Sequence, residues 1–325
     1  MLGIINHHYI RNDFTAPYPS IFGITPQQFK RKLKEYIQFA KVVSENTVVE
    51  AIANDTELKG KHILISFDDG LKEQYKYALP VLNELDLPAI FYINTKPLME
   101  NKICGVHKIH IVRSLLSTEY ILQELIHAFN KQIDKECLDM ALVKGEEHYK
   151  YDKGKAAQLK YLLNFVLSSH NLEEYIDYLF ESVCNLNENE MCESLYMNEK
   201  EIKELAQLGY IGSHSHEHIP LGLQTEEQIN KNLNDSKMIL ENLTGEEISG
   251  FSFPYGGFDS CKGLTKDLVN SGYKYAVTME RSINKNLKYP FQLGRLDNND
   301  THLGKNYKYE ELDFFNKYPA QSWQL

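Results

Sequence analysis

The stretch ILISFDDG, residues 63–70, runs from four apolar or small residues and a phenylalanine directly into two adjacent carboxylates and a glycine. A short apolar run of this kind is typical of a buried strand, so Asp68 and Asp69 are expected at a strand end. Two neighbouring carboxylates repel each other unless a cation or a shared proton holds them. The alternative is an Asp-Asp-Gly turn that caps a helix, and this segment alone leaves both interpretations open.

Strands and helices alternate on either side of this segment, which is typical of βα units and favours an α/β barrel of roughly seven strands. The expected strands are Leu2–Asn6, His62–Phe67, Ala89–Asn94, Tyr210–Ser213, Gly250–Phe253, Tyr275–Met279 and Phe291–Leu296. The expected helices include Pro26–Ala40, Glu73–Leu85, Glu199–Leu208, Glu226–Leu243 and Thr265–Ser271.

The alternation stops between about residues 105 and 195, where apolar residues recur only at helical spacing. We interpret this stretch as a helical insertion between two barrel strands, of the kind that shapes a substrate pocket. An aromatic tail follows at residues 307–325 and contains Trp323, the only tryptophan of the chain. We expect this tail to be a packing segment, with docking onto a neighbouring subunit as the alternative.

Composition narrows the class of protein. The 325 residues carry 35 Lys and Arg against 45 Asp and Glu, a net charge of -10, and no basic cluster, which disfavours binding to nucleic acid. Five scattered cysteines do not suggest a disulfide framework. The first residues lack the pattern of a secretory signal, and no run of about 18 apolar residues predicts a membrane span. We therefore expect a cytoplasmic protein, of oligomeric state that the sequence does not indicate.

Three histidines, His214, His216 and His218, directly follow the expected strand Tyr210–Ser213. Neutral imidazole is the commonest metal ligand, although a cluster held only by local hydrogen bonds is the alternative. In an extended chain alternate histidines would face the same way, whereas in a turn His214 and His218 would converge and His216 would point aside. Two imidazoles and one carboxylate leave a position open for water, as in catalytic metal sites.

Two further strand ends carry candidate residues. The sequence PYGG, residues 254–257, predicts a tight loop that can turn a backbone N–H toward a site, as an oxyanion hole requires, although a plain turn is also possible. Arg295 and Asp297 lie near the end of the last expected strand. An arginine there can orient a carboxylate through two parallel hydrogen bonds, and a surface salt bridge is the alternative.

The segments ILISFDDG, IGSHSHEHIPL and FSFPYG, in this order and spacing, resemble the motifs of the polysaccharide deacetylase family (NodB homology, carbohydrate esterase family 4). The resemblance covers about residues 60–100 and 197–297. It implies an α/β fold, a distorted (β/α)7 barrel that forms one domain over residues 1–325 around the helical insertion. It also implies a hydrolase that uses one divalent metal ion, usually zinc, and a carbohydrate substrate.

The resemblance also implies roles for individual residues. Asp68 would be the catalytic base, Asp69, His214 and His218 would be the metal ligands, and the amide of Tyr255 would form the oxyanion hole.

Substrate contacts are implied near the same motifs. The opening INHHYIRND is similar to the Y-H-Y-V-R sequence of many intracellular members, which would place His8 near the site. Pro254 precedes the oxyanion-hole residue. His107, at the start of the helical insertion, would reach the open end of the barrel from the side of that insertion.

The chain departs from the family pattern in three places. The arginine of the third motif is Ser252 here, and we take Arg295 as the candidate catalytic substitute. The Asp-Trp motif is absent, and the L-x-H motif that provides the general acid is not recognisable. The remaining candidates for the general acid are His302, His107 and His110.

We therefore expect a metal-dependent hydrolase that removes an acetyl group from an N-acetylated sugar or sugar derivative, in the biosynthesis of a surface polysaccharide. An O-acetyl esterase or an N-deformylase would use the same site. A carbohydrate-binding protein that has lost turnover is another alternative, to which the missing arginine gives weight. A non-haem iron oxygenase also uses two histidines and a carboxylate, but the βα alternation disfavours it.

Overall fold

The computed structural model describes residues 1–15, 18, 21, 23–149, 152–167 and 169–323. It divides into two compact units. The first contains residues 1–13, 23–102 and 189–325, and the second contains residues 14–22 and 103–188. Among the described residues, no helix combines the length and the apolar character that a membrane span needs.

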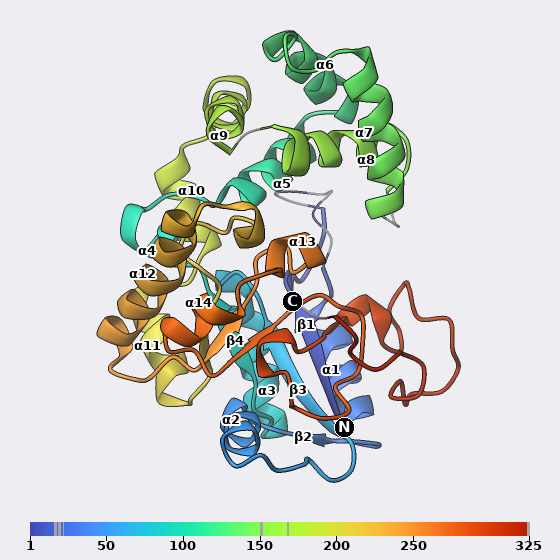
Figure 1. Ribbon diagram of the computed structural model, residues 1–325, viewed down its shortest axis with the longest axis vertical. Helices are drawn as coiled ribbons and strands as arrows, with labels where there is room; N and C mark the ends of the chain where they lie inside the picture. Colours follow the sequence, from blue (N-terminus) through green and yellow to red (C-terminus); the bar gives the residue numbers. More distant parts are fainter. Residues whose placement is uncertain (16–17, 19–20, 22, 150–151, 168, 324–325) are drawn as a thin grey trace. The chain divides into compact units, whose positions relative to one another are not determined.

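The first unit is built on a parallel sheet that curls into a distorted (β/α)7 barrel (Figure 1), which confirms the expected fold. Its strands follow the order β7-β6-β5-β4-β3-β1-β8, and the short strand β2 pairs with β3. The strands are β1 Leu2–His7, β2 Lys41–Val42, β3 His62–Phe67, β4 Ile90–Ile93, β5 Ile211–Ser213, β6 Gly250–Ser252, β7 Tyr275–Val277 and β8 Leu296–Asp297.

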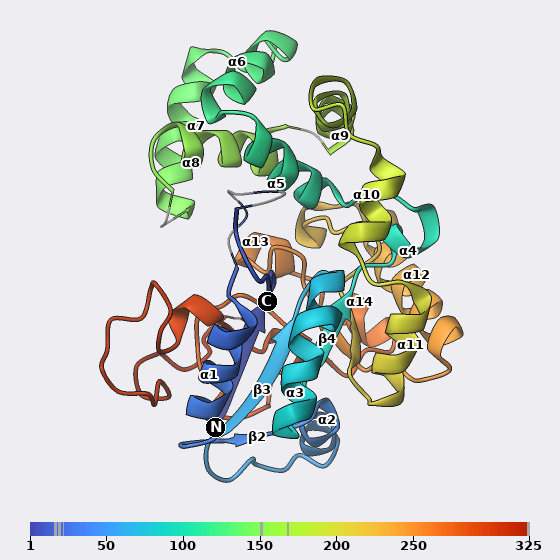
Figure 2. The same cartoon turned by 180° about the vertical axis from the view of Figure 1, so that it is seen from behind.

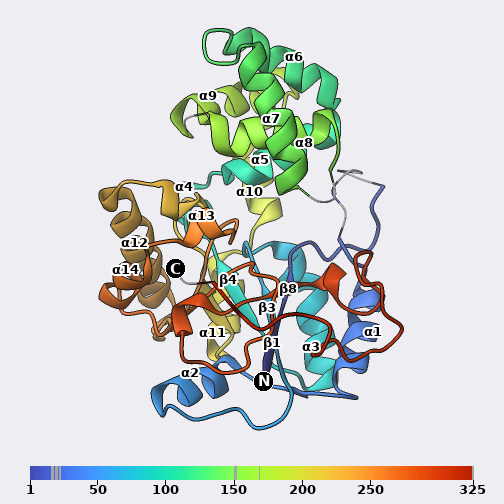
Figure 3. The same ribbon diagram turned by 45° about the vertical axis from the view of Figure 1, so that its right-hand side comes forward.

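Helices surround the outer face of this curled sheet, as in other α/β barrels. Figure 2 shows α1 and α3 along β3 and β4, and Figure 3 shows α12 and α14 on the other side from α1. The helices of the first unit are α1 Pro26–Tyr36, α2 Glu45–Ala53, α3 Leu79–Leu85, α4 Lys96–Glu100, α11 Glu199–Gln207, α12 Glu226–Thr244, α13 Phe258–Cys261 and α14 Thr265–Asn270.

Apolar side chains fill the space between sheet and helices. Phe67 on β3 stacks on Phe91 of β4, with ring centroids 4.5 Å apart, and meets Phe29 of α1 edge to face. The tail adds to this core: Phe314 is fully buried and packs edge to face against Tyr36. Burial of such rings stabilises the barrel by a few kcal/mol each, at about 25 cal/mol per Å² of apolar surface.

The regular structure of the second unit, over the part of it that is described, is all helical. Its helices are α5 Gly105–Leu115, α6 Thr118–Ala128, α7 Lys135–His148, α8 Lys155–Tyr161 and α9 Ser169–Tyr178, and two π-helical turns lie at Leu162–Val166 and Leu179–Val183. The helix α10, Glu188–Leu195, leads the chain back to the first unit. Inside the second unit the buried ammonium of Lys108 lies 2.8 Å from a carboxylate oxygen of Glu188.

Three expected elements need correction. Residues 291–292 belong to a 3-10 turn and the last strand is only Leu296–Asp297, so the expected strand Phe291–Leu296 is mostly wrong. The helix expected over Glu73–Leu85 begins with a π-helical turn at Gln74–Ala78, and the helix expected to reach Ala40 ends at Tyr36. The strand β2 was not expected, because two residues are too short for a hydrophobic period to emerge.

Candidate active site

The residues that the sequence marked after β3, β5 and β6 lie at the carboxyl end of the barrel, where enzymes of this architecture place their sites. Arg295, expected near the end of the last strand, instead directly precedes β8. The pairing of β1 with β3 places Asn6 beside Ser66 and His7 beside Phe67, and the amide of Asp68 donates to the carbonyl of His7. The residues after β1 and β3 are therefore neighbours at this edge.

The two aspartates at the end of β3 face different partners. Asp69 has a φ of +81°, a left-handed conformation that non-glycine residues rarely adopt and that clusters at functional sites. This turn directs Asp69 toward two histidines, while Asp68 faces an arginine and an asparagine. Asp68 and Asp69 therefore do more than form an Asp-Asp-Gly turn that caps a helix.

Asp69, His214 and His218 form a cluster whose ligand atoms all lie within 4.8 Å of one another. Oδ1 of Asp69 is 3.4 Å from Nε2 of His214 and 3.3 Å from Nε2 of His218. Tetrahedral zinc bonds of about 2.0–2.1 Å hold ligand atoms about 3.3–3.4 Å apart. All three residues are buried, and their spacing therefore fits one small divalent cation.

The loop after β5 decides which histidines converge. Ser215 and His218 both have left-handed backbone, at φ +66° and +57°, and the amide of His218 donates to Oγ of Ser215. The chain therefore turns rather than continuing extended. His216 points aside, with Nδ1 2.9 Å from Oγ1 of Thr95 and Nε2 3.1 Å from a carboxylate oxygen of Glu100.

His214 is oriented from behind by Ser252, the residue that stands where the family has arginine. Nδ1 of His214 lies 2.7 Å from the carbonyl oxygen of Ser252, so Nδ1 carries the proton and Nε2 faces Asp69. In metal-binding histidines, a hydrogen bond from the ring nitrogen that does not bind the metal commonly fixes the tautomer. Burial lowers the pKa of His214, but the charges of Asp68 and Asp69 outweigh it and raise that pKa, so the site attracts a positive charge.

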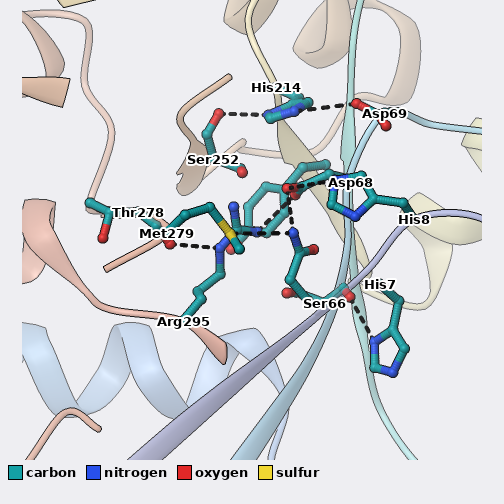
Figure 4. A network of polar contacts seen from close by, with 12 residues as sticks. His7, His8, Ser66, Asp68, Asp69, His214, Ser252, Thr278, Met279 and Arg295 are labelled. Atoms are coloured by element: carbon teal, nitrogen blue, oxygen red, sulfur yellow. Dashed lines mark hydrogen bonds and ion pairs between the residues drawn. The ribbon is translucent and has the colours of Figure 1, made fainter. Parts of the chain in front are cut away.

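Asp68 is held between three groups (Figure 4). One oxygen is 2.9 Å from Nη1 of Arg295, and the other accepts a hydrogen bond from Nδ2 of Asn6 at 2.9 Å and lies 4.0 Å from Nε2 of His8. Burial raises the pKa of Asp68, but the positive charges of Arg295 and His214 lower it to about 2. Asp68 is therefore an ionised, buried carboxylate at neutral pH.

Arg295 is fully buried, which rules out the surface salt bridge considered from the sequence. It reaches Asp68 with one nitrogen and not two, because its Nε donates to the carbonyl of Thr278 at 2.9 Å. The expected bidentate contact is therefore wrong, although the expected carboxylate partner is present.

Tyr255 lies in the loop after β6, with a φ of +61° and its ring 5.3 Å from that of His218. Pro254 before it is buried. The loop is fixed by a hydrogen bond from the amide of Met279 to the carbonyl of Gly256, where any larger residue would collide with Met279. The backbone of this loop is thus fixed beside the cluster of Asp69, His214 and His218.

The other candidate histidines differ in their surroundings. His8 is 38% exposed and lies next to Asp68, whereas its neighbour His7 is buried. His302 is paired with Glu35 of α1 at 2.8 Å. His107 and His110 lie on α5 in the second unit, with ring centroids 6.0 Å apart, and a role for His107 in substrate binding stays a prediction.

Three polar residues that support the site were not singled out from the sequence. Asn6 holds Asp68, Gln74 donates to the carbonyls of His8 and Asp68, and the amide of Asn94 donates to the carbonyl of His214. Asn6 and Asn94 could have been noticed as polar residues at the carboxyl ends of apolar strands. Gln74 carries no such signal, since it lies in a helix among other polar residues.

Comparison with known proteins decides the family. The sequence model described as polysaccharide deacetylase matches residues 55–127 and 162–276, more than half of the chain. The chain belongs to the polysaccharide deacetylase family. The matched ranges include Asp68, Asp69, His214, His218 and Tyr255, but they leave out the three groups around Asp68, which are Asn6, His8 and Arg295.

Solved structures share the fold of this chain. The deacetylase PplD of Streptococcus pyogenes, in complex with acetate, is 15% identical over 91% of both chains, with a TM-score of 0.56. A de-N-acetylase from Aggregatibacter actinomycetemcomitans is 15% identical over 91% of this chain and 94% of that one, with a TM-score of 0.53. IcaB from Ammonifex degensii is 16% identical over 90% and 91%, with a TM-score of 0.50. No curated protein sequence matches the chain.

Proposed function

We propose that this protein is a metal-dependent hydrolase that removes the acetyl group from an N-acetylated sugar or sugar derivative. One observation carries the proposal: Asp69 joins two histidines in a cation-sized cluster, and the adjacent Asp68 is kept ionised beside that cluster by Arg295. A ligand set and a separate base at one strand end are what hydrolysis of an amide needs.

The residues present fit a divalent metal ion, and among the divalent ions we propose zinc. A carboxylate and two imidazoles are ligands that zinc prefers, and their mutual spacing matches a tetrahedral site with one position left open. When bound, such an ion supplies Lewis acidity, which polarises a carbonyl oxygen and makes water a stronger acid.

Two different residues of the protein would then carry out the two proton transfers of the reaction. Asp68 accepts a proton from the water that attacks the acetyl carbonyl, and Arg295 and Asn6 hold its carboxylate in place. The backbone amide of Tyr255 stabilises the negative charge that develops on the carbonyl oxygen. As the donor of the proton to the leaving amine we choose His8, which is partly exposed and lies 4.0 Å from Asp68, in place of the candidates His302, His107 and His110 named from the sequence.

Arg295 also argues against the alternative of a carbohydrate-binding protein that has lost catalytic activity. That alternative gained weight because the third motif lacks its arginine. The charge that the family places at position 252 is supplied here from the start of β8, next to the same aspartate. The base therefore retains a cationic partner although the motif lacks it.

We further propose that the protein acts in the cytoplasm on a precursor of a surface polysaccharide. The five cysteines are an odd number, lie scattered along the sequence and include no C-x-x-C pair, a pattern that does not suggest a disulfide framework and is typical of proteins in a reducing compartment.

The test is acetate release from a panel of N-acetylated sugars, oligosaccharides and sugar nucleotides, measured on chelator-treated protein with and without added Zn²⁺. We expect about one metal ion per chain and release that depends on it, and Asp68→Asn should bind the metal but lose turnover by a factor of about 10²–10⁴. Metal binding without release from any substrate would contradict the proposed activity, and absence of metal binding would contradict the site.

A further inference from the structure

The loop that carries both histidine ligands has a backbone that its surroundings must hold in place. We call residues 214–218 the ligand loop. Ser215 and His218 lie in the left-handed region, at φ +66° and +57°, which residues other than glycine adopt only where neighbouring groups impose it. The contacts that hold the ligand loop therefore decide where the imidazole of His218 points.

The first half of the ligand loop is held by the residues that follow β4. Three successive hydrogen bonds run from residues 94–96 to the carbonyls of residues 214–216. Asn94 donates with its side-chain amide, and the next two residues donate with their backbone N–H groups. None of these three bonds reaches residues 217 and 218, so they do not fix the half of the loop that contains His218.

The second half is held by Asn232 of α12, whose side chain is fully buried. Oδ1 of Asn232 accepts a hydrogen bond from the backbone N–H of Glu217 at 2.9 Å, and Nδ2 donates to the carboxylate of Glu217, also at 2.9 Å. Nδ2 donates in addition to the carbonyl of Gln228 at 3.0 Å. Because the amide is engaged on both its oxygen and its nitrogen, it cannot rotate without losing bonds in a buried place. The residue directly before His218 is thus fixed to α12 at two points.

The next turn of α12 connects to the same loop. Ser236 accepts a hydrogen bond from the hydroxyl of Ser213 at 2.9 Å, and that hydroxyl accepts one from the amide of Ser215 at 3.3 Å. The hydroxyl of Ser215 in turn accepts a bond from the amide of His218 at 3.1 Å. Both left-handed residues of the ligand loop are therefore joined to α12 through one network.

We propose that Asn232 is a positioning residue of the metal site, which sets the direction of the His218 imidazole through its two bonds to Glu217. The inference rests on the proposed function, because it needs the cluster of Asp69, His214 and His218 to bind a metal ion. Bonds from zinc to nitrogen are confined to about 2.0–2.1 Å, so a small displacement of one ligand weakens the site. Groups behind the ligands change metal affinity about 10- to 100-fold when they are replaced.

Metal affinity gives the first test. Asn232→Leu removes both bonds to Glu217 at nearly constant volume, and its Kd for Zn²⁺, measured by competition with a chromophoric chelator, should rise about 10- to 100-fold. Asn234→Leu, on the exposed face of the same helix, is the matched control and should keep the wild-type Kd.

A pair of polar variants keeps the test decisive if Asn232→Leu does not fold. Asn232→Asp still accepts the bond from the amide of Glu217 but places two carboxylates face to face, so we expect its Kd for Zn²⁺ to rise. Adding Glu217→Gln returns a hydrogen bond between the two side chains, with donor and acceptor exchanged. The double variant should therefore bind Zn²⁺ within about threefold of the wild-type Kd.

The visible absorption of bound Co²⁺ gives a readout that a change in stability alone does not move. The position and intensity of this absorption depend on the coordination geometry of the ion. On folded, Co²⁺-loaded protein, we expect a changed spectrum in Asn232→Asp, and in Asn232→Leu where it folds. Asn234→Leu and the double variant should give the wild-type spectrum.

The outcomes separate this inference from the proposed function. A wild-type Kd and a wild-type Co²⁺ spectrum in Asn232→Asp would overturn the positioning role. A raised Kd in Asn232→Asp that Glu217→Gln does not reverse would also overturn it, because the contact with Glu217 would then not be the cause. Failure of the proposed function would appear instead as no release of acetate from any substrate by a wild-type protein whose metal affinity still responds to these substitutions.

Discussion

Nη1 of Arg295 lies 2.9 Å from Oδ1 of Asp68, although 227 residues separate them in the chain. Both groups are buried, and the contact joins the start of β8 to the end of β3 across β1, which lies between them in the sheet. It keeps the carboxylate that we assign as the base in its charged form.

The first prediction concerns this ion pair. Arg295→Gln leaves a buried carboxylate without its countercharge, so we expect acetate release to fall about 100-fold, with lower thermal stability. Arg295→Lys keeps the charge but loses the bond from Nε to Thr278, and should retain intermediate activity. Rates would be measured on metal-loaded, folded protein.

Arg281→Gln is the control for Arg295, because Arg281 pairs with Asp300 and is partly exposed. We expect its rate to match the wild-type rate. If Arg295→Gln lowered the melting temperature but kept full activity per folded molecule, Arg295 would have only a structural role.

The second prediction separates the three histidines after β5. His214→Ala and His218→Ala should each remove most of the bound metal, because each deletes a ligand from the cluster with Asp69. His216→Ala should keep its metal, since the nitrogens of His216 are engaged by Thr95 and Glu100. Metal content after dialysis gives the answer, and a loss of metal in His216→Ala would refute the ligand assignment.

The third prediction tests His8 as the general acid. An amine must be protonated as it leaves, whereas p-nitrophenolate leaves without a proton. His8→Gln should therefore slow release of acetate from an N-acetyl sugar about 100-fold and affect p-nitrophenyl acetate much less. His302→Gln, whose wild-type ring is paired with Glu35, should change neither rate. Equal slowing of both substrates by His8→Gln would indicate a role other than proton donation.

The fourth prediction concerns stability and pH. Glu45 at the start of α2 is buried and accepts a hydrogen bond from the hydroxyl of Tyr275 at 3.0 Å. Burial raises the pKa of Glu45 to about 8. A carboxyl whose pKa is higher in the folded state than in the unfolded state stabilises the fold at low pH, and this contribution is lost as pH rises toward 8.

Glu45→Gln should remove that loss, because the amide oxygen still accepts the bond from Tyr275 but does not ionise. We expect the free energy of unfolding to fall between pH 5 and pH 8 by roughly 3–4 kcal/mol more in the wild-type protein than in the variant. Urea denaturation at the two pH values provides the measurement. An identical pH dependence in both proteins would show that Glu45 ionises normally in the fold.

The sequence by itself determined the barrel and the residues at its strand ends. Apolar runs such as Ile63–Phe67, each followed by a turn and a helical pattern, predict parallel βα units from local spacing alone. The carboxyl ends of parallel strands share one edge, so the placement of Asp68, Asp69 and the histidine segment at one site also followed from the sequence.

The tertiary structure decided what residue spacing had left open. The family resemblance implied that His218 and not His216 joins Asp69, but the physical cause is the pair of left-handed turns at residues 215 and 218, which residue spacing does not encode. That Arg295 reaches Asp68, and that Trp323 meets Phe258, depends on the order of strands in the sheet and on the anchoring of the tail by Glu280. Hydrophobic periodicity is a short-range signal, whereas these contacts join residues far apart in the chain and exist only once the strands have assembled into the curled sheet.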